Sequence, residues 1–142
     1  MDSLNRAKVS VSIAGDDLIP SEITALLGAS PRLGVCKGEV FLGSHGKHLV
    51  AKTGKWHFGG GWESTPNLDK QIASVLAELT DNELAWKEVT TRFDCYLNVG
   101  GYFNDWTGGM TLQPSTMKLL ADRHFAIDFD LYAPASSDRP TR

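Results

Sequence analysis

Acidic and aromatic side chains alternate with apolar ones in two stretches of the sequence, as they do along β-strands with one buried face. In the stretch 92–99 the polar positions include Asp94, Tyr96 and Asn98. In the stretch 125–132 they are Asp128, Asp130 and Tyr132. If both strands belong to one sheet, these side chains share its solvent-facing side with Ser10 and Ser12 of a third alternating stretch, 8–14.

Neighbouring carboxylates on a sheet face are compatible with three kinds of function. They could bind a divalent cation or transfer protons, or they could meet a basic protein surface. A sheet face that is merely solvated is the simplest interpretation, protein contact comes second and catalysis third.

The segment 100–109 follows the first strand directly, and we expect it to be a loop that carries aromatic side chains for recognition. The predicted binding residues are therefore Asp94, Tyr96, Tyr102, Phe103, Trp106, Asp128 and Asp130. The alternative for Trp106 is that it fills one end of the core.

A basic stretch, residues 44–57, contains three lysines, three histidines and no acidic residue. His45, His48 and His57 could bind a metal, but zinc usually takes four ligands and no cysteine or carboxylate lies in this stretch. We expect a solvated hairpin here, with no metal and no cofactor.

Motifs for nucleophilic catalysis and phosphate binding are absent from the sequence. There is no G-x-S-x-G, no P-loop and no G-x-G-x-x-G after a strand, and the run 59–61 of three glycines is interpreted as a flexible connection. The two cysteines, Cys36 and Cys95, are far apart in sequence and form no CxxC site. Cys95 falls on the apolar side of its strand, so we expect it to be reduced and packed.

Apolar periodicity and helix-boundary residues place the helices. A short amphipathic helix is predicted from Pro20, which suits a first helical position, to Gly28, which suits the stop. Asn67 is the predicted cap of a longer helix, residues 67–80. The apolar stripe of this helix is Leu68, Ile72, Val75, Leu76 and Leu79. Asp81 or Asn82 should cap a further helix that runs to Val89.

The predicted fold class is α+β, with a mainly antiparallel or mixed sheet covered by helices on one face, ferredoxin-like or a variant of it. The segment Leu18–Leu26 matches Leu112–Leu120 at Leu, Pro, Ser and the final Leu. Each copy lies between two strand-like stretches. Either the chain contains two repeated β-α-β halves, or both segments are simply helices that begin at proline.

Several short motifs resemble a bacterial family known as domain of unknown function 4279. They are L-x-P-x-x-I-T-x-x-L-G at 18–28, Pro31, Lys37-Gly38-Glu39, Gly54-Lys55-Trp56, Leu112-x-Pro114 and Asp130-x-Tyr132. One departure is Ile19, where a capping aspartate is expected before the proline, so Asp16 or Asp17 would have to replace it. The resemblance covers residues 9–132 and implies no established activity.

Bulk properties narrow the functional classes. With 142 residues we expect a single domain, 1–142, with an ordered core over about 8–132 and a flexible tail over 133–142. The net charge is −3, and residues 59–142 carry twelve acidic against seven basic side chains, which disfavours nucleic acid as a partner. The N-terminal residues lack the apolar core of a signal peptide, and no apolar run would span a membrane. We therefore expect a cytoplasmic location.

The function predicted from the sequence is that of a binding or protein-interaction module without catalytic activity. Its partner is expected to be a protein, with a second copy of the chain as one candidate. Two alternatives remain: an immunity-type inhibitor of a basic toxin, and a small enzyme that uses the carboxylates of the open sheet face.

Overall fold

The computed structural model describes residues 4–134. Their elements, in chain order, are β1 (Leu4–Gly15), α1 (Pro20–Leu27), β2 (Leu33–Val35), β3 (Val40–Leu42), β4 (His48–Val50), β5 (Gly54–Ser64), α2 (Leu68–Ala77), α3 (Glu83–Arg92), β6 (Asp94–Phe103), α4 (Pro114–Asp122) and β7 (Ala126–Tyr132). Within this part of the chain, no helix is both long enough and apolar enough to cross a membrane. The tail predicted to be flexible lies outside the described residues from 135 onward.

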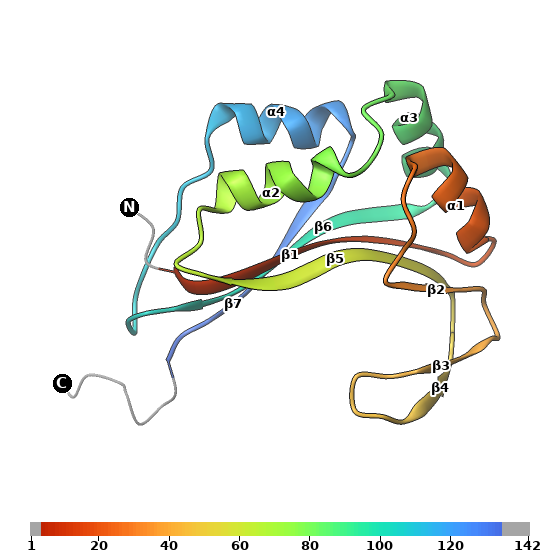
Figure 1. Ribbon diagram of the computed structural model, residues 1–142, viewed down its shortest axis with the longest axis horizontal. Helices are drawn as coiled ribbons and strands as arrows, with labels where there is room; N and C mark the ends of the chain where they lie inside the picture. The colour runs from red at the N-terminus through yellow and green to blue at the C-terminus, as the bar shows by residue number, and fades with distance from the viewer. Residues whose placement is uncertain (1–3, 135–142) are drawn as a thin grey trace.

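Five strands form one mixed sheet in the order β2-β5-β1-β6-β7. Strand β1 pairs antiparallel with both β5 and β6, β2 pairs antiparallel with β5, and β6 and β7 run parallel. All four helices lie on one side of this sheet, and the separate hairpin β3–β4 lies on the other side, at the β2 end (Figure 1). The predicted α+β class with helices on one face is confirmed. The ferredoxin-like arrangement and the repeat of two halves stay predictions.

The hydrophobic core fills the space between the sheet and the helices. Alternate residues of β1, from Ala7 to Ile13, are at most 1% exposed. The helices contribute the buried side chains Ile23, Leu27, Leu68, Ile72, Leu76, Trp86, Val89 and Leu120. The burial of the predicted stripe 68–79 is confirmed, because only Val75 among its five members remains partly exposed, although α2 ends at Ala77 and Leu79 follows it.

Helix boundaries follow the residues that predicted them. Pro20 is the first residue of α1, and Gly28 ends it with a left-handed φ of 82°. The side chain of Asn67 accepts a hydrogen bond from the Lys70 amide at 3.1 Å and caps α2. Asn82, rather than Asp81, caps α3 by accepting from the amides of Leu84 and Ala85. The start of α1 has no side-chain cap at Ile19, and the Asp16 carboxylate binds the Lys37 ammonium instead.

Helix α4 also lacks a cap of its own and takes one from α2. The Oδ1 atom of Asp69 accepts a hydrogen bond from the Gln113 amide at 3.0 Å and from the Thr116 hydroxyl at 2.5 Å. A carboxylate at this position also interacts favourably with the positive end of the α4 dipole. Because Asp69 is in the first turn of α2, this contact fixes the start of α4 against the start of α2.

The three glycines at 59–61 are part of β5, so the prediction of a flexible connection is wrong. Gly59 pairs with Ser10 and Trp62 with Lys8, which leaves one extra residue in β5 and makes a β-bulge. Gly59 and Gly60 have φ values of 83° and 106°, which residues with a side chain rarely adopt. The bulge therefore continues the pairing of β5 where composition alone indicated a break.

Strand β6 extends past its predicted end at Val99, so the prediction of a loop over 100–109 is wrong for its first four residues. Tyr102 and Phe103 are strand residues whose side chains lie on opposite faces. The two preceding residues are glycines, and neighbouring side chains occupy the space that a side chain there would need. A Cβ on Gly100, for example, would lie 3.2 Å from Lys8 Cε. Strand β1 begins at Leu4, earlier than predicted, because it pairs with this extension.

The last strand differs from its prediction at one position. Alternation with Asp128 and Asp130 predicts that Phe129 points toward the core, but 41% of it is exposed. Strand β7 is last in the strand order, and its helix-facing side is covered less completely than the helix-facing side of β1. Residue alternation indicates which side of the sheet a residue takes, whereas its burial depends on what lies above that side.

Truncating Leu76 to Ala should lower the free energy of unfolding by about 2–5 kcal/mol, because the side chain is 1% exposed and its removal leaves a cavity in the core. Denaturant-induced unfolding followed by circular dichroism would measure the change. Leu84→Ala is the matched control, since Leu84 is 77% exposed on α3 and its truncation should change the stability by less than about 0.5 kcal/mol. Equal effects of the two substitutions would contradict the core described above.

Cys95 should resist thiol reagents until the protein unfolds. The thiol is 8% exposed, and burial, with a smaller contribution from the charge of Asp94, raises its pKa to about 12. Thiolate is the reactive form, so at about pH 8 modification should be slower than for an ordinary thiol by roughly three orders of magnitude. The measurement is modification by Ellman's reagent in a Cys36→Ser variant, with the same variant in concentrated guanidinium chloride as control. Rapid modification of the folded variant would show that Cys95 is accessible.

Candidate functional site on the open face of the sheet

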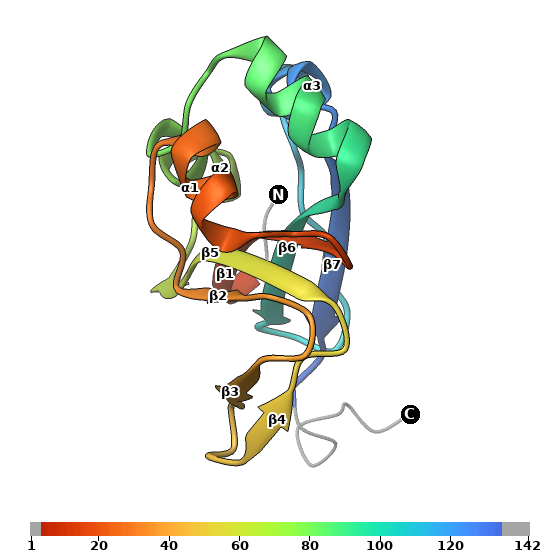
Figure 2. The same cartoon turned by 90° about the vertical axis from the view of Figure 1, so that its right-hand side faces the viewer.

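The open face is the side of the five-stranded sheet that no helix covers, and the hairpin β3–β4 bounds it at one end (Figure 2). Its side chains lie in rows that cross the strands. One row joins Ser64, Arg6, Tyr102 and Tyr132, and the next joins Trp62, Lys8, Gly100 and Asp130. A third row joins Ser10, Asn98 and Asp128. Strands distant in sequence thus bring aromatic, basic and acidic side chains together.

Three aromatic rings and one guanidinium form a connected cluster at one end of this face. The Tyr102 ring stacks on the Tyr132 ring at 5.2 Å between centroids, and it lies 5.8 Å from the Trp62 ring. The Arg6 guanidinium lies 4.6 Å from the Trp62 centroid and 4.5 Å from the Tyr102 centroid, within cation–π range of both. We call Arg6, Trp62, Tyr102 and Tyr132 the aromatic platform.

The platform is fixed in place yet remains accessible to a partner. Trp62 is 45% exposed and Tyr132 is 47% exposed, although both rings contact the platform's other members. Contacts among the rings and Arg6 limit the rotamers of these side chains before any partner binds. Less side-chain entropy is therefore lost on association than with isolated exposed aromatics.

A hollow of about 420 Å³ adjoins the platform between β1, β6 and β7, where Gly100 has no side chain. The aliphatic part of Lys8 lies over Gly100, and its ammonium reaches the Trp62 ring at 4.9 Å. Asp128 and Asp130 line the opposite side of the hollow. Positive charge therefore lies on β1 and negative charge on β7, so the face is electrically divided across its width.

Two ionisable groups on this face have shifted pKa values. The Tyr132 hydroxyl donates to Asp130 at 2.9 Å, and this hydrogen bond, followed by the carboxylate charge, raises the pKa of Tyr132. Tyr132 therefore remains a protonated donor at neutral pH and is no base. Burial, followed by the charges of Arg32 and Lys55, lowers the pKa of His57 from its ordinary value of 6.5. His57 is therefore neutral at pH 7 and adds no positive charge to this face.

The structure brings some of the predicted binding residues together and separates others. Asp128, Asp130, Tyr96 and Tyr102 all lie on the open face, and Tyr96 is 41% exposed. Asp94 is on the same face but eight residues along β6 from Tyr102, roughly 26 Å away, so it belongs to the other end. Phe103 packs against the core from the helix side, and Trp106 is half-buried in the segment after β6.

Sequence reasoning missed Arg6, Lys8 and Trp62 as members of the site. Arg6 comes before the predicted ordered core, which begins at about residue 8, and Trp62 follows the glycines that were interpreted as a flexible connection. A glycine run flanked by aromatic residues was the available signal, because glycine inside a strand pattern often marks a bulge. Counting across one extra residue places Trp62 on the same face as Lys8.

The histidines of the basic stretch are distributed over different elements. His48 belongs to β4, His57 to β5, and His45 to the turn that joins β3 and β4. Over residues 4–134, no group of three or more His, Cys, Asp and Glu side chains has an arrangement that could hold a metal ion. The absence of metal from the purified protein stays a prediction.

Comparison with known proteins identifies a family. No curated protein and no solved structure matches the chain significantly. A family model described as a domain of unknown function, DUF4279, matches residues 5–134, which is most of the chain and nearly all of its described part. The short motifs around Pro20, Trp56 and Tyr132 had already indicated this family. The chain belongs to the DUF4279 family.

Proposed function

We propose that the protein is a binding module that recognises a protein partner through the open face of its sheet, with the aromatic platform as the centre of contact. The observation that carries this proposal is the cluster of Trp62, Tyr102, Tyr132 and Arg6, which is exposed yet held in place by mutual stacking. Tryptophan, tyrosine and arginine are the residues that most often dominate the binding energy of protein interfaces.

The charges beside the platform determine the kind of partner. Asp128 and Asp130 lie next to it on β7, and neither forms an ion pair within the described part of the chain. A partner that places a lysine or arginine here and an apolar or aromatic side chain on the platform would match both features. A net charge of −3 also favours the approach of a basic partner. An inhibitor of a basic toxin would belong to this class.

Photo-crosslinking is the experiment that identifies the partner without assuming its identity. Benzoylphenylalanine at Tyr96 places the reactive group on the open face, whereas at Leu84 it is on the helix side. In the native host, the Tyr96 position should give a specific crosslinked protein that the Leu84 position does not give. A partner captured only from Leu84 would place the interface on the helices and contradict the proposal.

The purified partner should then bind Trp62→Ala at least tenfold more weakly, because an exposed ring at the centre of an interface is lost. The double variant Asp128→Asn, Asp130→Asn should mainly slow association, and its association rate should depend less on salt concentration than that of the unsubstituted protein. Surface plasmon resonance at two salt concentrations would separate these effects, with Leu84→Ala as the control that leaves binding unchanged. Full affinity in folded variants of Trp62 and of both aspartates would place the binding surface elsewhere.

A further inference from the structure

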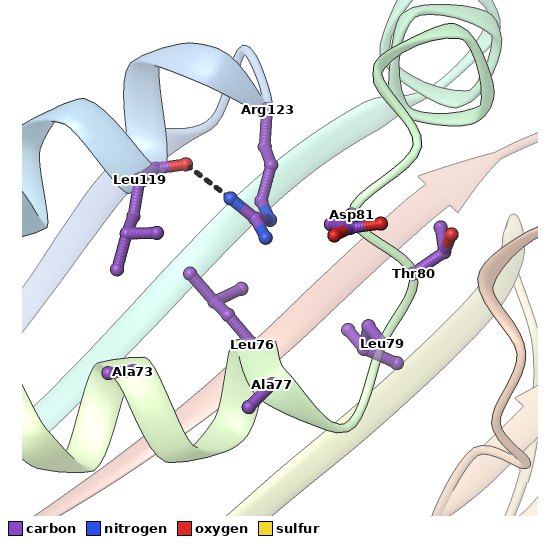
Figure 3. A pocket seen from close by; sticks show the side chains of 8 residues that line it. All are labelled: Ala73, Leu76, Ala77, Leu79, Thr80, Asp81, Leu119 and Arg123. Carbon is purple, nitrogen blue, oxygen red and sulfur yellow. Dashed lines mark hydrogen bonds between the residues drawn. The ribbon is translucent and has the colours of Figure 1, made fainter.

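A second cavity lies on the helix side of the sheet, between α2, α4 and the turn that joins α2 to α3 (Figure 3). Its volume is about 480 Å³, within the ~300–1,000 Å³ that small-molecule sites usually occupy. The sheet separates it from the open face, so it is independent of the function proposed above. Its lining is mainly apolar and comes from Ala73, Leu76, Ala77, Leu79 and Leu119.

Arg123 supplies a cation at the opening of this cavity. Its Nη1 donates to the Leu119 carbonyl at 3.1 Å, and its Nε is buried without a hydrogen-bond partner among the described residues. A guanidinium has five N–H donors in a fixed planar arrangement, and leaving a buried one unpaired is unfavourable. In Figure 3 the group extends from the end of α4 into the space above Leu76. The guanidinium lines the cavity, and its terminal nitrogens rather than the shielded Nε are placed to receive a carboxylate.

Asp81 supplies an anion on the facing side of the opening. It lies in the turn before α3, where the neighbouring residue Asn82 makes the helix cap, so the carboxylate of Asp81 is not used for capping. Figure 3 shows Asp81 and Arg123 on two sides of the same opening. They nevertheless form no ion pair with each other among the pairs found in residues 4–134. The two opposite charges thus border one apolar cavity without neutralising each other directly.

We propose that this cavity binds a small zwitterion with an apolar side chain, that is, a free α-amino acid of the size of leucine. The ligand carboxylate would pair with Arg123, its ammonium with Asp81, and its side chain would cover the accessible apolar residues Ala73, Ala77 and Leu119. An α-amino acid carries both charges within a few bonds of each other, which matches two charged groups that share one opening. A peptide chain presents its two ends far apart and fits this arrangement less well.

Titrations followed by NMR of the 15N-labelled full chain test this assignment. Leucine should shift the amide signals around the cavity and saturate at concentrations no higher than about 10 mM. Two analogues each lack one charge: 4-methylpentanoate has no ammonium, and 3-methylbutylamine has no carboxylate. Each should bind at least about tenfold more weakly than leucine, because one charged side chain remains unpaired. Glycine, which lacks the apolar side chain, should also bind more weakly.

Substitutions assign each charge to its partner. Asp81→Asn should weaken leucine at least about tenfold and leave 4-methylpentanoate unchanged, whereas Arg123→Gln should weaken both of these ligands and leave the amine unchanged. Arg32→Gln and Asp94→Asn are matched controls outside the cavity and should bind leucine normally. Asp81 is at an exposed turn, so its variant remains informative even if Arg123→Gln folds poorly.

Three results would overturn the proposal. The first is the absence of shifts at the cavity with leucine. The second is equal affinity for leucine and for both singly charged analogues. The third is that Asp81→Asn and Arg123→Gln each lower the thermal stability, that the double variant is no less stable than either single one, and that leucine does not stabilise the unsubstituted protein. This result would show that the two side chains form an internal ion pair in solution.

Discussion

The structure depends on one constraint: strand β1 is hydrogen-bonded on both edges but covered by helices on only one face. Its residues must therefore alternate, and from Ala7 to Ile13 every second side chain enters the core. The remaining row, which includes Arg6 and Lys8, has to face away from the helices. A slip of one residue in pairing would reverse the two rows, so the apolar row fixes the register that forms the aromatic platform.

The two candidate sites are on opposite sides of the sheet and are built differently. The platform depends on backbone pairing, because Tyr102 and Tyr132 are neighbours in register. The cavity depends on how the helices pack. Asp69 caps α4 from α2, and the same two helices then provide Leu119 and Leu76 as facing walls. Arg123 follows directly after the other end of α4 and lies at the opening of the cavity.

The sequence predicted correctly those helices and strands that are determined by residues close together in the chain. Alternation predicted β1, β6 and β7, and Pro20, Gly28 and Asn67 predicted where helices begin or end, because caps and turns involve residues close in sequence. The predictions failed at glycines 59–61 and 100–101. Glycine favours loops by its own conformational freedom, whereas here Gly59, Gly100 and Gly101 pair with β1, and Gly60 and Gly61 lie in the bulge between paired residues.

The candidate site was predicted only in part for the same reason. Asp128, Asp130 and Tyr96 follow from alternation within single strands, and they lie on the open face as predicted. Trp62 and Arg6 could be added only with knowledge of which strands are neighbours, because they approach Tyr102 from two different strands. Burial likewise requires the position of the helices, as the exposure of Phe129 at the last strand shows.

The position of β7 at the end of the sheet also affects how readily this edge can pair with a strand of another chain. An edge strand has unpaired backbone groups that could template strand addition by another chain, and charged side chains on such a strand oppose this. Asp128 and Asp130 bring two negative charges to the seven residues of β7. A second copy adding antiparallel along this edge would bring like charges together. Replacing both aspartates by valine or threonine would remove this repulsion and leave Phe129 exposed on a strand of high β-propensity, which is a composition typical of aggregating edges.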